Sequence, residues 1–360
     1  MVWNWELKEW PSFYYDTESI LEQESQFLLG LGSATAFLKT IGEAEYYKLV
    51  VEILGQEGIE SSKIEGEILD RESLQSSIKK HFGLAPDVRR VGKKESAMAE
   101  LLCNVYESFQ KPLSREILCK WHEMLFKGAT ESGQYRNHSE PMQIVSNRLD
   151  LQKIFFEAPP SAKVPYEMDR FISWFNGIDK KSSILGQAAI LHVYFESIHP
   201  FEDGNGRIGR ALVEKLISRI IGRPVLISVS KVLEKRKKEY YSALESCNKT
   251  LNAQALVEFF SQAVLEAQKD AMDLIQFLVA KSKLFTSLAG KINPRQEKAL
   301  LKMFERGPLG FEGGLSAENY IAITKASRAT ATRDLAELIS LDALRKSGEL
   351  RYTRYWLNLK

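Results

Sequence analysis

Apolar residues recur at three- and four-residue spacing along most of this 360-residue chain. Runs of this kind span residues 46–54, 98–109, 168–175 and 190–195, and few stretches are rich in β-branched residues. This period matches the turn of an α-helix, whereas strands alternate with a period of two. The pattern therefore predicts a mainly α protein.

The helical pattern is interrupted between residues 142 and 164. Two short extended runs, 143–145 and 153–156, flank the polar residues Asn147-Arg148-Leu149-Asp150, and Pro159-Pro160 follows. Extended runs on either side of a polar turn indicate a β-hairpin. We expect one such hairpin on the helical body.

The last 70 residues show a separate pattern. Asn293-Pro294 starts a helix and Arg306-Gly307-Pro308 ends it. Two short helices at about 317–323 and 328–341 follow, and then a hairpin-like segment with strands at 344–346 and 350–356. A helix-turn-helix followed by a two-stranded wing predicts a winged-helix domain at residues 291–360.

The N-terminal segment is rich in aromatic residues. Trp3, Trp5, Trp10 and Tyr14 lie in a stretch that contains Pro11 and lacks helical periodicity. Large aromatic side chains contribute most when they are buried. We expect them to pack onto the first helices, in preference to forming a ligand site.

Charge and cysteine content exclude several classes of protein. The net charge is +2, and only residues 291–360 are basic, with 13 Lys and Arg against 8 Asp and Glu. The whole molecule is therefore not a general nucleic-acid or membrane binder. No apolar run approaches the roughly 20 residues of a membrane span and the start lacks a secretory signal, so we expect a cytoplasmic location without a membrane partner. Cys103, Cys119 and Cys247 show no metal-binding spacing and are expected to be reduced thiols.

The most informative stretch runs from His199 to Arg210. Gly204-Asn205-Gly206 can turn successive backbone N–H groups inward, and the following helix adds its positive N-terminal end, which favours a phosphate ligand. Asp203 offers a hard oxygen ligand suited to Mg²⁺ shared with substrate phosphates. His199 is the group in the stretch whose ordinary pKa suits a general base near neutral pH.

Arg207 and Arg210 complete the set, because three-residue spacing puts both guanidinium groups on one helix face. Each feature alone has a common structural explanation: a turn, a solvated arginine pair or a core histidine. Their combination within twelve residues has none, and it predicts a site for a polyphosphate.

The stretch matches the H-x-F-x-D-G-N-G-R-x-x-R signature of the Fic family of protein AMP transferases at every fixed position. The chain resembles that family over residues 61–262, including Gly133-Gln134-Tyr135-Arg136 and the hairpin. The terminal modules look like those of one bacterial branch. The resemblance implies three parts: residues 1–90, an N-terminal helical region; 91–285, the Fic catalytic core with a β-hairpin flap; and 291–360, the winged helix.

What the family implies is transfer of AMP from ATP, the co-substrate, to a Ser, Thr or Tyr hydroxyl of a protein, with pyrophosphate released. His199 would be the base, Asp203 would hold Mg²⁺, and Phe201 would anchor the loop in the core. The resemblance also implies that Gly204, Asn205 and Gly206 surround the phosphates and that Arg207 and Arg210 bind the distal phosphates. It implies that Tyr240, Tyr241 and Asn248 contact the adenosine. The flap that docks the target protein would consist of Ile154, Phe155, Phe156 and Glu157.

An inhibitory pattern precedes the core. Ser61, three residues, then Glu65 and Gly66 fit the family's inhibitory motif, within residues 61–66. Ser61 and Glu65 share one helix face, and Gly66 permits the helix to bend or end. We expect Glu65 to pair with Arg210 inside the ATP site, which predicts an autoinhibited enzyme.

Several alternatives stay open at this point. The motif does not separate AMP transfer from AMP removal, from an enzyme that does both, or from transfer of a different phosphate-containing group. The protein is alternatively a DNA-binding regulator that uses residues 291–360, with Arg328, Thr330, Thr332 and Arg333 on the recognition helix and Arg351 and Arg354 on the wing. The target protein, automodification and a homodimer are also open.

Overall fold

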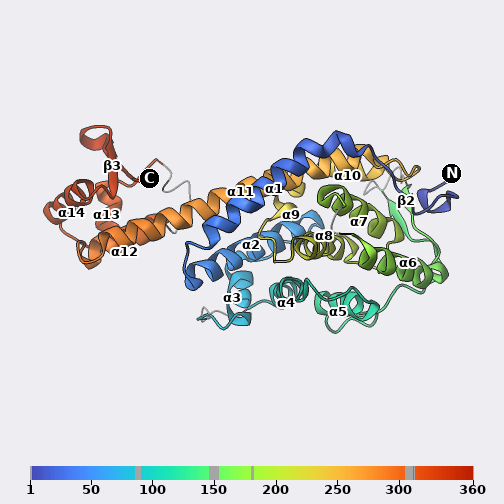
Figure 1. Cartoon of the computed structure of the whole chain (residues 1–360). Helices are drawn as coiled ribbons and strands as arrows, with labels where there is room; N and C mark the ends of the chain where they lie inside the picture. Colours follow the sequence, from blue (N-terminus) through green and yellow to red (C-terminus); the bar gives the residue numbers. More distant parts are fainter. Residues whose placement is uncertain are drawn as a thin grey trace. The chain divides into compact units, whose positions relative to one another are not determined.

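The computed structural model describes residues 2–85, 91–145, 154–179, 182–304, 311 and 313–359. These residues form fourteen α-helices and four short strands (Figure 1). The predicted mainly α fold is confirmed.

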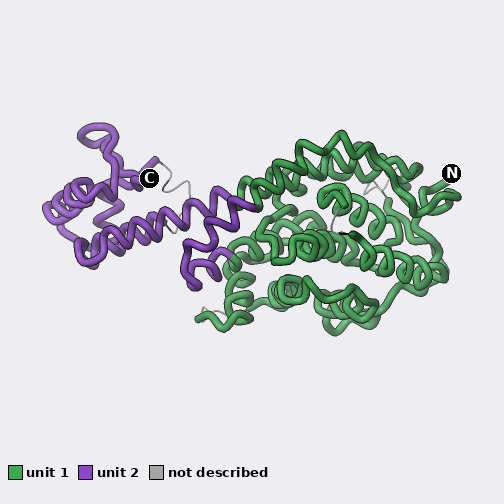
Figure 2. Tube along the Cα trace, in the orientation of Figure 1, with its two compact units in different colours: residues 1–31, 50–271 green, residues 32–49, 272–360 purple. Residues whose placement is uncertain are grey.

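The chain forms two compact units, residues 1–31 with 50–271 and residues 32–49 with 272–360 (Figure 2). Three long helices contribute to both: α1 (Leu21–Leu38), α2 (Glu43–Ile64) and α11 (Gln254–Leu288). The expected division at residues 90 and 291 stays a prediction.

The first unit is built around α7 (Ile184–Ile198) and α8 (Asn205–Ile221), which pack closely together. Almost every residue of α7 is buried. The Ser183 hydroxyl and the Glu24 carboxylate accept hydrogen bonds from the amides at its first turn, so the helix starts without unpaired donors. Six further α-helices among the described residues belong to this unit: α3 (Arg71–His81), α4 (Lys93–Ser108), α5 (Arg115–Leu125), α6 (Val164–Gly177), α9 (Val229–Lys235) and α10 (Lys237–Ser246).

The expected strands are present as an antiparallel pair. β1 (Gln143–Val145) pairs with β2 (Ile154–Glu157), and Ile144 lies opposite Phe156. The predicted turn at Asn147–Asp150 lies outside the described residues. Phe156 is buried while Ile154 is exposed, although side chains two apart in a strand share a face. The pairing with β1 shifts register between these two positions.

Two of the N-terminal tryptophans are buried as expected, but their rings contact β2 and α7, whereas the first helices were expected. Trp3 and Trp10 are buried, and the Trp3 ring contacts Phe156 of β2 edge-on at 5.5 Å. The Trp5 indole N–H donates to the backbone oxygen of Glu157. The expectation is wrong for Tyr14, whose ring is exposed; its backbone instead forms a bridge with Asn252.

The second unit has its own apolar core. Its helices are α12 (Pro294–Phe304), α13 (Ala317–Thr324) and α14 (Arg328–Ser340), and β3 (Leu344–Ser347) pairs with β4 (Arg354–Leu357). The predicted stop at Arg306-Gly307-Pro308 lies outside the described residues. The second strand starts later than predicted because Leu350 has a φ of 50° and opens a 3₁₀ turn. The winged-helix assignment stays a prediction.

None of the helices in the described parts of the chain combines the length and the apolar character needed to cross a membrane.

Candidate active site

The stretch from His199 to Arg210 joins the two buried helices α7 and α8, as predicted. α7 ends at His199, which adopts the left-handed conformation (φ 50°, ψ 61°) that residues other than glycine seldom adopt. Gly204 precedes α8 with a φ of 81°. The loop therefore brings His199 and the N-terminal end of α8 to the same place.

A side chain at either of two glycines of the loop would meet a neighbour: the Phe126 ring at Gly204, and the end of the flexible Glu65 side chain at Gly206. A Cβ atom on Gly204 would lie 2.7 Å from the Phe126 ring, and one on Gly206 would lie 2.0 Å from Oε1 of Glu65. Amides of the first helical turn have no partner within the helix. The N-terminal end of α8 can therefore approach an anion closely.

Phe201 and Asn205 hold the loop in shape. The Asn205 side chain accepts from the Phe201 N–H at 3.0 Å and donates to the Phe201 carbonyl at 2.7 Å. The Phe201 ring is fully buried and stacks on His122 at 4.3 Å. Phe201 thus anchors the loop, which agrees with its implied role, whereas the Asn205 side chain is engaged inside the protein.

Arg136 supports the strained backbone at His199. This arginine is buried and donates to the carbonyl oxygens of His199, Ile198 and Pro159 and to the Ser161 hydroxyl. Four acceptors around one guanidinium compensate the cost of burying its charge. The arginine of the Gly133–Arg136 segment therefore positions the catalytic loop.

The surroundings of His199 suit a general base. Its Nδ1 lies 3.3 Å from the backbone oxygen of Glu196, and because a carbonyl only accepts, Nδ1 carries the proton and Nε2 keeps its lone pair. Burial lowers the pKa of His199 to about 4. The imidazole is therefore neutral near pH 7.

Arg210 is held by the segment predicted to be inhibitory. Its guanidinium donates to Oε1 of Glu65 at 2.8 Å, to the Ser61 hydroxyl at 2.9 Å and to the Ser61 carbonyl at 2.8 Å. Arg210 is 4% exposed. The expected contact between Glu65 and Arg210 is therefore present, and Ser61 takes part in it.

Gly66 ends α2 in a way that explains its place in the pattern. With a φ of 81°, it donates its N–H to the carbonyl of Lys63, and the next N–H, of Glu67, donates to the carbonyl of Ser62. These two bonds are those of a Schellman motif, which favours glycine or asparagine at the left-handed position. The turn directs Glu65 and Glu67 toward α8.

Glu67 forms a second ion pair that the sequence did not suggest. Its Oε2 lies 2.9 Å from Nη1 of Arg207, and its Oε1 lies 2.7 Å from Nζ of Lys94. Arg207 also approaches Asp203 at 3.6 Å. Both arginines of the signature are therefore paired with acids from the end of α2.

A cavity of about 740 Å³ opens beside the loop. It is lined by the following predicted site residues: Glu65, Gly66, Phe155, Phe156, His199, Asp203, Gly204, Asn205, Gly206, Tyr240, Tyr241 and Asn248. Residues far apart in sequence thus converge on one volume.

Other predicted residues do not line this cavity. Ser61, Phe201, Arg207 and Arg210 are buried behind its wall, where they hold the loop and the end of α2. Ile154 and Glu157 lie on the strand β2 but are not part of the lining.

The predicted adenosine contacts lie on α10 and after it. Tyr240 is buried and its hydroxyl lies 2.7 Å from Nε2 of His192, while the Tyr241 ring is 44% exposed. The Asn248 amide donates to the backbone oxygen of Phe155 at 2.9 Å. In this structure Asn248 therefore ties β2 to the cavity wall.

Two backbone carbonyl groups of β2 already accept hydrogen bonds from side chains of the protein. Asn248 binds the carbonyl of Phe155 and Trp5 binds that of Glu157. A target segment added as a strand would have to use other backbone groups or displace these donors.

Several side chains at the site were given no role from the sequence, among them Glu67, Glu196 and Lys237. Glu196 and Lys237 line the cavity, and Lys237 donates to the carbonyl of Ile64 at 2.6 Å. Glu196 is the one acidic residue of the mainly apolar helix α7, and an acid in such a helix could have indicated a functional side chain. Lys237 lies in a charged run that is typical of a solvated helix.

The residues fit a magnesium ion of the kind that retains water. Asp203 is a 70% exposed carboxylate at the cavity wall, next to the N-terminal end of α8. The described residues contain no group of three or more metal-ligating side chains. Mg²⁺ commonly uses one or two carboxylates together with substrate phosphates.

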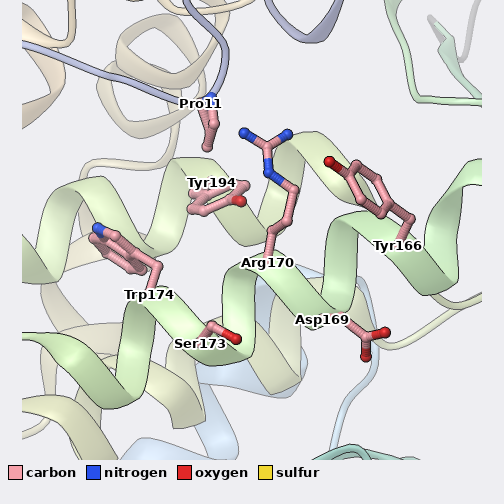
Figure 3. Close-up of a pocket in the computed structure, with 7 residues that line it drawn as sticks. All are labelled: Pro11, Tyr166, Asp169, Arg170, Ser173, Trp174 and Tyr194. Atoms are coloured by element: carbon pink, nitrogen blue, oxygen red, sulfur yellow. The ribbon is translucent and has the colours of Figure 1, made fainter.

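A second, shallower cavity of about 410 Å³ lies on α6 (Figure 3). Tyr166, Arg170 and Trp174 of that helix line it together with Tyr194 of α7. None of the predicted site residues takes part in it.

The fold is mainly helical, and comparisons with known proteins agree with it. Residues 112–217 match the Fic/DOC family, and residues 3–84 match a domain of unknown function, DUF4172. A Fic family protein of Desulfovibrio desulfuricans has a similar fold, with a TM-score of 0.58 and 21% identity over 96% of this chain and 97% of that chain. The chain carries a Fic domain.

Two relatives are named for an activity. A probable protein adenylyltransferase of Aquifex aeolicus is 26% identical over 162 residues, which cover 44% of each protein. The protein adenylyltransferase Fic of Drosophila melanogaster is 30% identical over 184 residues, 47% of this chain and 36% of that protein. The match spans less than half the length of these relatives.

Proposed function

We propose that this protein transfers the AMP moiety of ATP to a hydroxyl group of a protein. The observation that carries the proposal is the convergence of His199, with its free Nε2 lone pair, and the N-terminal end of α8 on one cavity. The names of the relatives support the same reaction.

The proposed reaction uses the groups around this cavity. Nε2 of His199 accepts the proton of the attacking hydroxyl while its oxygen bonds to the α-phosphorus of ATP. The bond from that phosphorus to the bridging oxygen breaks, and pyrophosphate leaves. The amides at the start of α8 stabilise the charge on the phosphate oxygens. Asp203 would hold Mg²⁺, which neutralises phosphate charge when it is bound.

We further propose that the resting protein is inhibited. Glu65 occupies Arg210 and Glu67 occupies Arg207, so neither guanidinium is available to the distal phosphates of ATP. Nucleotide that enters the cavity competes with two acids for these arginines. Transfer is then slow until the end of α2 moves.

The test is intact-mass analysis of the Glu65→Gly variant after incubation with ATP and Mg²⁺. We expect a gain of one AMP, and a much smaller gain in the wild type. The matched control is Glu65→Gly combined with His199→Ala, which should still bind ATP in calorimetry and gain no AMP. Transfer by the His199→Ala variant would rule out His199 as the base, and its absence in Glu65→Gly would contradict the proposed reaction.

AMP removal is a second candidate, because the Glu65 carboxyl lines the cavity next to His199 and can orient a water molecule. Incubation of AMP-modified protein without nucleotide separates the two reactions. Release of free AMP by the wild type, and none by Glu65→Gly, would favour hydrolysis.

A further inference from the structure

Glu196 is a carboxyl group inside the site to which the reaction above gives no task. It lies on α7, three residues before His199, and its side chain is 16% exposed. Its Oε1 is buried, and nothing in the described part of the chain forms a hydrogen bond with it. An unpaired buried carboxyl oxygen is costly, so its presence calls for a functional explanation.

The carboxyl of Glu196 lies on the Nδ1 side of the His199 imidazole. Oε2 is 3.8 Å from Nδ1, and the backbone oxygen of Glu196 is 3.3 Å from the same atom. Nε2, the atom that would take the hydroxyl proton, is not engaged by Glu196. A negative charge at Nδ1 stabilises a protonated imidazole without blocking the reacting nitrogen.

Glu196 and Glu65 reach the same face of α8. A Cβ on Gly206 would meet Oε1 of Glu65 at 2.0 Å, and one on Gly209 would meet Oε1 of Glu196 at 2.6 Å. Positions three residues apart lie one turn apart on a helix face. The two carboxyls are therefore neighbours, and Arg210 is hydrogen-bonded to Glu65 alone of the two.

The charged and titratable groups around Glu196 come from four helices. They are Glu65 of α2, His192 and His199 of α7, Arg210 of α8, and Tyr240 and Tyr241 of α10. Burial, and then the charge of Glu65, raise the pKa of Glu196 to about 8. Burial is the larger cause, and the charge of Glu65 adds to it because two carboxylates close together do not both ionise readily.

We propose that Glu196 is a positioning residue for His199: its ionised form stabilises the imidazolium that forms during transfer, and the charge of the neighbouring Glu65 opposes its ionisation in the resting protein. The inference rests on the proposed AMP transfer. Withdrawal of Glu65 then has two effects, because it frees Arg210 for phosphate and removes a charge that opposes the ionisation of Glu196 beside Nδ1.

The test compares Glu65→Gly with Glu65→Gly/Glu196→Gln across pH. We expect kcat to fall about 10-fold in the double variant and the acidic limb of kcat to move about one unit lower, because His199 loses a stabilising charge. The KM for ATP should change less than about twofold, because Glu196 is not proposed to bind ATP. A loss of 1.4 kcal/mol in ATP binding would change it about tenfold. Glu116→Gln in the same background, an exposed carboxyl on α5, is the matched control and should change neither quantity.

A second measurement does not depend on transfer. NMR titration of ¹⁵N-labelled histidine, with the His199 signal assigned by its loss in His199→Ala, should give a lower pKa for His199 in the double variant than in Glu65→Gly. If the Gln variant does not fold, Glu196→Asp in the same background should give an intermediate pKa.

The outcomes separate the two proposals. An unchanged pKa of His199 or an unmoved acidic limb overturns the role of Glu196, even where kcat falls, since a packing defect alone has that effect. Absence of transfer in Glu65→Gly, together with the expected change in the pKa of His199, overturns the proposed reaction and leaves the pairing of Glu196 with His199 standing.

Discussion

Glu67 of the α2 terminus lies 2.9 Å from Arg207, beside the 2.8 Å pair of Glu65 and Arg210. Arg207 and Arg210 are one turn apart on α8, so a single helix end supplies an acid to each. Because the Schellman turn at Gly66 holds both acids, a small displacement of this end would release both arginines together.

Glu67→Gln should raise basal AMP transfer. A partly exposed ion pair contributes about 1 kcal/mol. Its loss corresponds to a roughly fivefold increase in nucleotide affinity, or in the fraction of molecules in which Arg207 is free. We expect Glu65→Gly/Glu67→Gln to exceed Glu65→Gly in ATP affinity measured by calorimetry. Glu60→Gln, which changes an acid on the same helix that does not contact α8 arginines, is the control. Equal affinities in the single and double variants would dismiss the second pair.

Gly66→Ala should weaken the inhibition through the backbone. No atom lies within 4 Å of a Cβ at Gly66, so the cost is that of the left-handed conformation alone, about 1 to 2 kcal/mol. We expect a lower melting temperature and faster basal transfer, and a smaller change for Gly66→Asn, since asparagine tolerates this conformation. Gly177→Ala also has free space but no positive φ, and serves as the control. Unaltered basal transfer in Gly66→Ala would show that the turn does not hold the acids.

Trp3→Ala should disturb the flap and spare the phosphate site. Trp3 packs edge-on against Phe156, and truncation of a buried tryptophan costs about 3 kcal/mol. In the Glu65→Gly background we expect weaker modification of a protein target with ATP affinity retained. Val2→Ala, at an exposed neighbouring position, is the control. A parallel loss of ATP affinity would argue against a separate flap.

Acid should destabilise the fold partly through His192. Burial lowers its pKa to about 3, so between pH 6.5 and pH 3 the unfolded chain binds a proton that the folded chain does not. Stability from this group is present above pH 6.5 and falls by about 2 kcal/mol on going from pH 7 to pH 5. Urea unfolding at both pH values should show a smaller drop for His192→Gln than for the wild type. An equal drop would mean that His192 is protonated in the folded protein.

Much of the fold could be predicted because local patterns decide it. The spacing of apolar residues in α7 and α8 is that of a helix, so it predicts these elements without knowledge of their packing partners. Gly204 and Gly66 lie at the turns that need a positive φ. The twelve-residue signature predicted a phosphate loop for the same reason, since the proposed base, carboxylate and glycines are close together in sequence.

Other features depended on contacts between distant segments. The spacing of Ser61 and Glu65 indicated an inhibitory helix face, but the pairing of Glu67 with Arg207 across 140 positions had no local signal. The same holds for Asn248, whose amide holds the carbonyl of Phe155, and for the tryptophans that cover β2.

The sequence by itself determined the helices, the loop and the kind of ligand it suits, because these follow from neighbouring residues and backbone geometry. Only the tertiary structure decided the state of the site. It brought the end of α2 against α8, so that both arginines are occupied, and it placed the Glu196 carboxyl beside His199. Ion pairs and buried charges are set by distances through space, and those distances are a property of the packed chain.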